Sequence, residues 1–278
     1  MELLRKIPQR LTDPVFYQKW RRKIIRCFRQ FTDQPQVTSL GGWWPSGKVV
    51  VVVAHPDDET FCSGLICELK ERGNAVEVVC VTRGEGGTTG KWTPEELGNV
   101  RGREMDRACE ILGVDRLSFL DHVDPVADEF RVYAPPVAPM ELADQLIPFL
   151  KEVDVIVSHG SGGEYWHPAH LRVYEAVAIA VDHEVIKEAA WMTFHARSED
   201  PALPELINED DESFLCLDVT RHEEKRALAL HCHESQISLF SKFASGDASD
   251  FIRLTSHESY SLKKKGMLEI PEAADVGE

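Results

Sequence analysis

The clearest hydrophobic pattern in the chain is an unbroken apolar run from Val49 to Ala54, preceded by Lys48. Five consecutive valines make both faces of this segment apolar. A strand with two apolar faces is typical of a parallel sheet that helices cover on both sides. The run is also far shorter than the roughly 20 residues that a membrane-spanning helix needs. We therefore expect a buried central strand over residues 48–54.

Short strands and amphipathic helices alternate through most of the chain that follows. Further strands are predicted over residues 76–82, 116–120, 153–158 and 214–219. Helices are predicted over residues 59–72, 94–112, 140–151 and 168–181, and from about residue 221 onward. Gly73 and Gly113 mark helix ends, and Pro168 stands at a first helical position, where a missing N–H costs nothing. This order predicts an α/β fold with a Rossmann-like, mostly parallel sheet and helices on both faces.

Charge divides the chain into a basic start and an acidic body. The first 31 residues carry a net charge of about +7, whereas the whole chain carries −16 at pH 7. Such an acidic body argues against a surface for duplex nucleic acid. An apolar stripe in the basic segment favours a helix packed on the domain, with contact to anionic lipids as the alternative. Its members are Phe16, Trp20, Ile24 and Phe28.

These shifts in composition suggest three parts. Residues 1–47 form a basic arm and linker, residues 48–270 a single catalytic domain, and residues 271–278 an acidic tail. Seven cysteines without a C-x-x-C pair do not suggest a disulfide framework, and no secretory leader is visible. We therefore expect a cytoplasmic protein. The sequence gives no indication of its oligomeric state.

Chemically active side chains gather directly after the valine-rich strand, in the box Ala-His-Pro-Asp-Asp-Glu at 54–59. In open α/β sheets, ligands bind beyond the carboxyl ends of the strands. Adjacent carboxylates repel one another unless a cation or a proton offsets their charge. The box therefore predicts a divalent metal ion at this edge of the sheet.

A second cluster follows the strand predicted over residues 153–158. It consists of His159, Glu164, Tyr165, His167 and His170. His167 and His170 stand three residues apart at the start of a helix, so they share one helix face. If the two clusters converge, two histidines and one aspartate with an open position would suit catalytic zinc. Another divalent metal such as Fe²⁺ is the alternative.

Taken together, these motifs resemble those of the PIG-L/LmbE-like zinc deacetylases, which remove acetyl groups from N-acetylglucosaminyl compounds. The resemblance spans roughly residues 49–236. Besides the box at 54–59, it includes T-R-G-E-G at 82–86, R-G-R-E at 101–104, H-P-A-H at 167–170 and H-E-S-Q at 233–236. It implies zinc as the cofactor and a small amino-sugar compound as the substrate.

The resemblance also implies roles for individual residues. The metal ligands would be His55, Asp58 and His170, and the general base would be Asp57. His167 would act as electrophile or acid, in its protonated form.

Other residues would contact the substrate. Tyr165 would lie near the oxyanion, and Arg101 and Glu104 would belong to a substrate-binding helix. Arg83 is a further candidate for sugar hydroxyls, with an ordinary surface ion pair as the alternative. His231 and His233 point in different directions on a helix, so both cannot reach one metal. His233 is the candidate to approach the site indirectly, with a solvated or capping histidine as the alternative.

One position departs from the family pattern. Such proteins usually carry an Asp before the second histidine of the H-P-x-H box, where this chain has Ala169. The nearest carboxylates along the chain are Glu164 and Glu175. We expect a zinc-dependent N-deacetylase in which a metal-activated water attacks the amide. The alternatives are an amidase for a larger acyl group and a catalytically decayed sugar-binding protein.

Overall fold

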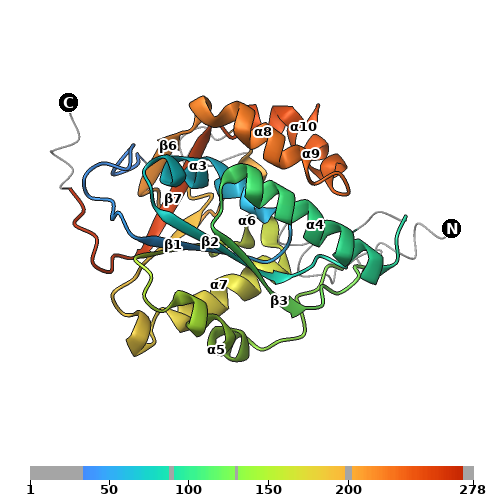
Figure 1. Ribbon diagram of the computed structural model, residues 1–278, viewed down its shortest axis with the longest axis horizontal. Coiled ribbons are helices and arrows are strands. Elements are labelled where there is room, and N and C mark those ends of the chain that lie inside the picture. Colours follow the sequence, from blue (N-terminus) through green and yellow to red (C-terminus); the bar gives the residue numbers. More distant parts are fainter. Residues whose placement is uncertain (1–33, 88–90, 129–130, 198–201, 272–278) are drawn as a thin grey trace.

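The computed structural model describes residues 34–87, 91–128, 131–197 and 202–271. One sheet runs through the molecule in the order β3-β2-β1-β4-β5-β7-β6 (Figure 1). Its strands are β1 (Lys48–Val53), β2 (Ala75–Thr82), β3 (Arg116–His122), β4 (Val155–Ser158), β5 (Ala190–Phe194), β6 (Leu215–Asp218) and β7 (His257–Lys264). Only β7 pairs antiparallel to its neighbours among these strands. The sheet is thus mixed but mostly parallel, as predicted.

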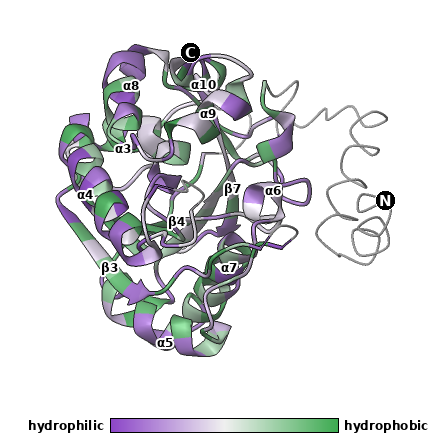
Figure 2. Ribbon diagram, turned by 90° about the vertical axis from the view of Figure 1, so that its right-hand side faces the viewer, coloured by the Kyte–Doolittle hydropathy of each residue, from purple (hydrophilic) through white to green (hydrophobic). Residues whose placement is uncertain are grey.

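Helices cover both faces of this sheet. They are α3 (Ser63–Glu71), α4 (Pro94–Leu112), α5 (Pro139–Leu150), α6 (Gly163–Trp166), α7 (Pro168–Ala180), α8 (Glu223–His231), α9 (Ile237–Ala244) and α10 (Ala248–Leu254). In Figure 1, α5 and α7 lie on one side, and α3, α4, α8, α9 and α10 lie on the other. Along α4 and α8, hydrophilic and hydrophobic residues alternate (Figure 2), as expected for helices with one buried face. Within the described residues, no helix is long and apolar enough to cross a bilayer.

Strand β1 shows why the sheet is covered on both sides. Val49, Val51 and Val53 join the apolar cluster that includes residues of α3, α4 and α8. Val50 and Val52 join the opposite cluster, under α5 and α7. All five valines are fully buried. The two-sided burial predicted from the valine run is confirmed. The loop that follows β1 therefore begins at the carboxyl edge of a buried central strand.

Helix α4 spans the predicted residues, and two local signals set its ends. Thr93 and Glu96 form a reciprocal capping box at its start. Gly113 closes it with a φ of +84°, which glycine adopts without steric cost. The helix predicted over residues 59–72 differs, because its first turn is a 3₁₀ helix (Asp58–Cys62) and α3 begins only at Ser63.

The start of the described chain packs on the domain. Val37 forms a bridge with Leu215, and Leu40 and Trp44 are buried in the core. The packed domain therefore extends to Val37, ahead of the predicted boundary at residue 48. The apolar stripe of the basic arm and the tail at 272–278 lie outside the described residues, so those predictions stay predictions.

Candidate metal centre and active site

The turn after β1 brings three titratable side chains together at the carboxyl edge of the sheet. His55, Asp57 and Asp58 are each at most 6% exposed. Asp58 Oδ2 accepts the backbone N–H of His55 at 2.8 Å, which closes the turn. Asp57 has a φ of +109°, a strained value for a residue with a side chain. Strain of this kind persists where the surroundings fix the conformation, and it is common at functional sites.

Arg101 on α4 connects this turn to the loop after β2. Its Nη2 donates to the carbonyl oxygen of Pro56 at 2.6 Å and to Asp57 Oδ2 at 3.1 Å. Its Nη1 donates to the carbonyl oxygen of Gly84 at 2.9 Å, in the loop after β2. The side chain is 4% exposed, and these partners all belong to the protein. Its predicted contact with substrate therefore stays a prediction.

The environment of Asp57 suits a group that exchanges protons near neutral pH. Burial raises the pKa of its carboxyl to about 6, against the opposing effect of Arg101 and with a further increase from Asp58. Oδ2 is held by Arg101, and the backbone N–H donates to Glu59 Oε2 at 3.0 Å. The carboxyl is thus anchored at one oxygen and through its own backbone.

The two histidines of the C-terminal segment behave differently. The buried His233 bonds through Nε2 to Glu59 Oε1, the carboxylate that also accepts the Asp57 N–H. His231 bonds to Ser249 nearer the surface. The prediction that His233 approaches the site indirectly is confirmed by this contact.

The second cluster lies between the end of β4 and the first turn of α7, a segment called the β4 loop below. His159 follows β4, and Glu164 lies in the short helix α6, fully buried. Oε2 of Glu164 accepts hydrogen bonds from His159 Nδ1 at 2.8 Å and from His170 Nδ1 at 2.6 Å. The backbone N–H of Ala54 donates to His159 Nε2 at 3.0 Å. This last bond joins the loop after β4 to the end of β1, so the two clusters converge.

Asp58 lies between the two predicted histidine ligands. His55 Nδ1 is 3.3 Å from Asp58 Oδ2, and His170 Nε2 is 3.3 Å from Asp58 Oδ1. Ligands of one tetrahedral zinc ion lie about 3.3 Å apart when each bond is about 2.0–2.1 Å. Nε2 of His55 and Nε2 of His170 are both buried, and each lies 3.3 Å from a carboxylate oxygen, of Asp124 and Asp58 respectively, without making a hydrogen bond within the described chain. Buried polar atoms without partners are costly, so these residues fit a bound cation.

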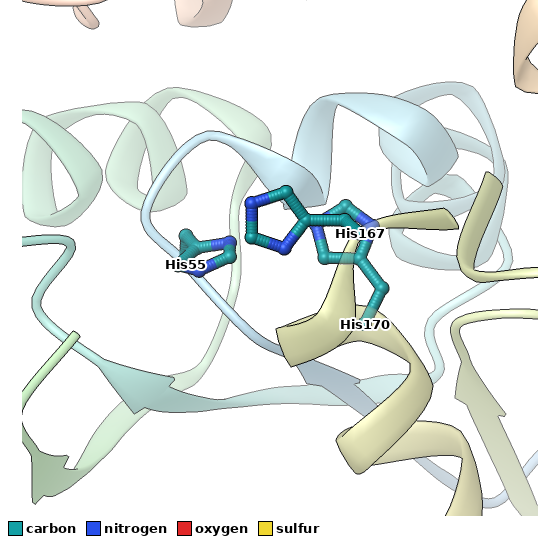
Figure 3. A group of neighbouring side chains, drawn as sticks. All are labelled: His55, His167 and His170. Atoms are coloured by element: carbon teal, nitrogen blue, oxygen red, sulfur yellow. The ribbon is translucent and has the colours of Figure 1, made fainter. Parts of the chain in front are cut away.

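Two overlapping groups of side chains have ligand atoms close enough for one ion. The first is His55, His167 and His170, whose rings converge in Figure 3. The second is Asp58, His159 and His170. His170 is common to both. The predicted set of His55, Asp58 and His170 is neither of these groups, because Asp58 contacts His55 through Oδ2 and His170 through Oδ1, so this ligand set stays a prediction.

His167 caps the start of α7. Its Nδ1 accepts the N–H of Ala169 at 3.3 Å. Burial lowers the pKa of His167 well below 6.5, and the neighbouring His170 and His55 add to this effect. The structure therefore favours neutral His167, contrary to the protonated form expected from the sequence. Its ring lies 4.7 Å from that of His55 and 4.6 Å from that of His170.

Among the described residues, no carboxylate forms an ion pair with His167 in place of the missing acid. Glu164 binds His159 and His170 instead, and Glu175 pairs with Arg172. Ala169 itself is fully buried in the apolar cluster beneath α7.

Tyr165 completes this wall of the site. Its ring lies 5.3 Å from that of His170 and 5.6 Å from that of His167. Burial raises the pKa of its hydroxyl well above 10, with a further increase from Asp58 and Asp57. The hydroxyl therefore keeps its proton and can donate a hydrogen bond.

The structure gives protein partners to two other predicted substrate residues. Both carboxylate oxygens of Glu104 bind Ser235, through the backbone N–H at 2.9 Å and the hydroxyl at 2.7 Å. Arg83 pairs with Asp121 at 2.8 Å and lies over the ring of Phe119. The surface ion pair that was the alternative for Arg83 is therefore present, and its role in substrate binding stays a prediction.

Asp124 is a site residue that the sequence pattern did not reveal. It lies after β3, is 6% exposed, and has Oδ1 at 3.3 Å from His55 Nε2. Burial opposes a high pKa of His55, but the charges of Asp124 and Asp58 raise it to about 9. A single Asp in the long segment between β3 and α5 carries no local motif, so only the fold identifies it.

Comparison with known proteins matches part of the chain to one family. Residues 50–181 match the family profile described as GlcNAc-PI de-N-acetylase, PIG-L. The chain carries a PIG-L domain. The match includes both clusters of the site, from the loop after β1 to the end of α7.

The relatives named here share one named activity. The 1D-myo-inositol 2-acetamido-2-deoxy-alpha-D-glucopyranoside deacetylase of Mycolicibacterium vanbaalenii is 28% identical over 233 residues, covering 70% of this chain and 82% of that protein. The enzyme of the same name from Actinosynnema mirum is 28% identical over 237 residues, covering 72% and 84%. Both relatives are deacetylases of an N-acetylglucosamine-type compound.

Solved structures share the fold at lower sequence identity. The N,N'-diacetylchitobiose deacetylase of Pyrococcus horikoshii superposes with a TM-score of 0.53 at 19% identity, over 78% of this chain and 84% of that chain. Teicoplanin deacetylase Orf2, in its zinc-inhibited form, gives 0.55 at 14% identity, over 77% and 97%. The 4-carboxy-2-hydroxymuconate hydratase of Pseudomonas putida gives 0.54 at 23% identity, over 78% and 96%. The fold therefore hosts more than one chemistry, and the reaction has to be argued from the site.

Proposed function

We propose that this protein is a zinc-dependent hydrolase that removes the N-acetyl group from an N-acetylglucosamine-type compound. The observation that carries the proposal is the convergence of the two clusters. Asp58 lies 3.3 Å from Nδ1 of His55 and 3.3 Å from Nε2 of His170. Nε2 of each histidine is buried and makes no hydrogen bond within the described part of the chain. The names of the relatives support the substrate class.

Hydrogen bonds favour one ligand set among the neighbouring side chains. His159 Nε2 accepts the N–H of Ala54, so its lone pair is already engaged. His167 Nδ1 accepts the N–H of Ala169, so a neutral ring carries its proton on Nε2 and offers no lone pair there. Without these two rings, the first group leaves His55 and His170 and the second leaves Asp58 and His170, and we propose these three residues together as the ligand set. Two imidazoles and one carboxylate suit zinc, with Fe²⁺ as the second choice.

Asp57 is the general base in this proposal. A bound zinc ion would polarise the amide carbonyl and lower the pKa of a water molecule towards about 7. Asp57 Oδ2 is held by Arg101, which leaves Oδ1 to take the proton from the attacking water. With a pKa of about 6, the carboxyl is mostly ionised at pH 7 and can accept a proton. This pKa is close enough to 7 for the protonated carboxyl to pass the proton on to the departing amine.

His167 and Tyr165 act as hydrogen-bond donors to the oxygen that gains negative charge. The cap to Ala169 places the proton of neutral His167 on Nε2, and the high pKa of Tyr165 keeps its hydroxyl protonated. Fixed donors of this kind stabilise developing charge without having to reorient during the reaction. This role for His167 replaces the imidazolium acid expected from the sequence.

An acetate-release screen tests the proposal. Purified protein, loaded with Zn²⁺ or Fe²⁺, is incubated with N-acetylglucosamine derivatives that carry different groups at the anomeric oxygen. We expect free acetate and a free amino sugar in equal amounts, and loss of turnover after chelation. Release of a larger acid from longer N-acyl derivatives, with no acetate, would favour the amidase instead. Binding of the sugars without any product would favour a decayed sugar-binding protein.

A further inference from the structure

We propose that Glu164 is a positioning residue of the metal site, since one of its oxygens accepts hydrogen bonds from both His159 and His170 and so sets which nitrogen of His170 faces Asp58. This inference rests on the proposed metal site and adds a residue that contacts neither metal nor substrate. Its role is to hold a ligand in one tautomer and one orientation.

The geometry at His170 leads directly to this role. A carboxylate oxygen can only accept, so the 2.6 Å contact with Glu164 Oε2 requires the proton of His170 to be on Nδ1. Nε2 then presents its lone pair at 3.3 Å from Asp58 Oδ1. Without Glu164 the proton could occupy either nitrogen, and the tautomer with the proton on Nε2 would have no lone pair there for a metal ion. Groups behind a ligand histidine commonly have this function.

His159 supports Glu164 from the other side. Its ring stacks on that of His170, with centroids 3.9 Å apart, so both Nδ1 atoms reach the same oxygen. A proton on Nε2 would set two N–H groups against each other, because Ala54 donates there at 3.0 Å. His159 therefore carries its proton on Nδ1 and connects the end of β1 to Glu164.

Hydrogen bonds to its other oxygen also hold the carboxylate of Glu164 in place. Oε1 accepts the N–H of Gly160 at 3.0 Å and Nδ2 of Asn208 at 3.2 Å. Glu164 has a φ of +55° and a ψ of −80°, a strained backbone conformation for any residue other than glycine. Asn208 Oδ1 stabilises this backbone by accepting the N–H groups of Gly162 and Glu164, each at 3.0 Å. A fully buried carboxylate with four donors and a strained backbone is costly to build, which indicates a specific role.

Zinc affinity tests the inference without relying on turnover. The dissociation constant for Zn²⁺ is measured by competition with a chromogenic chelator for the wild type, Glu164→Gln and Glu175→Gln. Glutamine has nearly the same size, but one of its two terminal atoms is an amide nitrogen that donates. Since hydrogen-bond donors face both oxygens of Glu164, this nitrogen would meet donors in either orientation. We expect Glu164→Gln to weaken Zn²⁺ binding by about 10–100-fold. Glu175→Gln is the matched control, because Glu175 is exposed on α7 and pairs only with Arg172 among the described residues.

A decrease of less than tenfold for a folded Glu164→Gln protein would overturn the inference while leaving the metal site intact. A wild-type protein that binds no Zn²⁺ would overturn the inference and the proposed function together. Strong Zn²⁺ binding that depends on Glu164, without any acetate release, would support the inference and contradict only the deacetylase proposal.

A second measurement decides the case if Glu164→Gln does not fold. The spectrum of ¹⁵N-labelled histidines in the metal-loaded wild type distinguishes the two tautomers. We expect His159 and His170 to carry their protons on Nδ1. An Nε2-protonated His159 or His170 would overturn the inference.

Discussion

The loop after β1 and the loop after β4 both contribute to the candidate metal centre, but different forces hold them. The β1 loop closes on itself, with Asp58 Oδ2 accepting the N–H of His55. The β4 loop is fixed by Asn208, which lies more than forty residues further along the chain. Each loop includes non-glycine residues with positive φ, Asp57 in the first and Glu164 in the second.

This difference separates a local motif from a long-range scaffold. The box at 54–59 contains two of the three proposed ligands and closes its turn through the bond between His55 and Asp58, so its sequence alone indicates the chemistry. The β4 loop contributes His170 only if Asn208 and Glu164 hold the preceding residues in place. We therefore expect substitutions in the β1 loop to affect the reaction directly, and substitutions behind the β4 loop to act through stability and metal affinity.

The largest expected effect comes from removing a ligand in either loop. His55→Ala and His170→Ala should each weaken Zn²⁺ binding by more than about 100-fold, beyond the range for groups that only orient a ligand. The measurement is metal content after dialysis against a weak chelator. Full zinc occupancy in His170→Ala would show that the β4 loop does not supply a ligand.

The next effect tests the scaffold of the β4 loop. Asn208→Ala removes the acceptor for two buried N–H groups, so we expect a loss of about 2–3 kcal/mol in the free energy of unfolding, together with weaker Zn²⁺ binding. Asn74→Ala is the matched control, because Asn74 is equally buried and holds the carbonyl groups of Pro45 and Gly47 at the other end of the sheet. Urea unfolding and zinc titration check both. Equal zinc affinity in the two variants would contradict the role assigned to Asn208.

A smaller effect tests the electrostatics of the β1 loop. Arg101 lowers the pKa of Asp57, and burial raises it, with a result of about 6. In Arg101→Met the ionised carboxylate is less stable, so Asp57 loses its proton only at higher pH. We expect the acid limb of kcat/KM to move up by about one pH unit or more. Arg103→Met is the control, since Arg103 is exposed on the same helix. An unmoved acid limb in Arg101→Met would mean that Asp57 does not set it.

Much of the fold could be predicted because its signals are local. The valine run identified β1, and the capping residues of α4 marked both ends of that helix. Strand β5 was missed because its five buried residues include one β-branched residue only, unlike the valine run of β1. Strand β7 was missed because it buries polar side chains, and Glu258 is paired with Arg226 of α8 and with N–H groups of α3.

The candidate site was predictable to the extent that it lies in contiguous boxes. The side chains of His55, Asp58 and His170 do lie together, although their role as ligands stays a proposal. Asp124 and Asn208 could not be predicted, because each reaches the site through the folded chain rather than through a motif. The low pKa of His167 could not be predicted either, since burial and the neighbouring histidines cause it.

The division of labour between the two adjacent carboxylates is tested most directly by one paired measurement. Zinc content and acetate release are determined side by side for Asp57→Asn and Asp58→Asn. We predict that Asp57→Asn keeps its zinc and loses about 10²–10⁴-fold in kcat, because only the general base is removed. Asp58→Asn should lose its zinc and its activity together. An Asp57→Asn protein without zinc, beside an Asp58→Asn protein that retains it, would contradict this assignment and reverse the two roles.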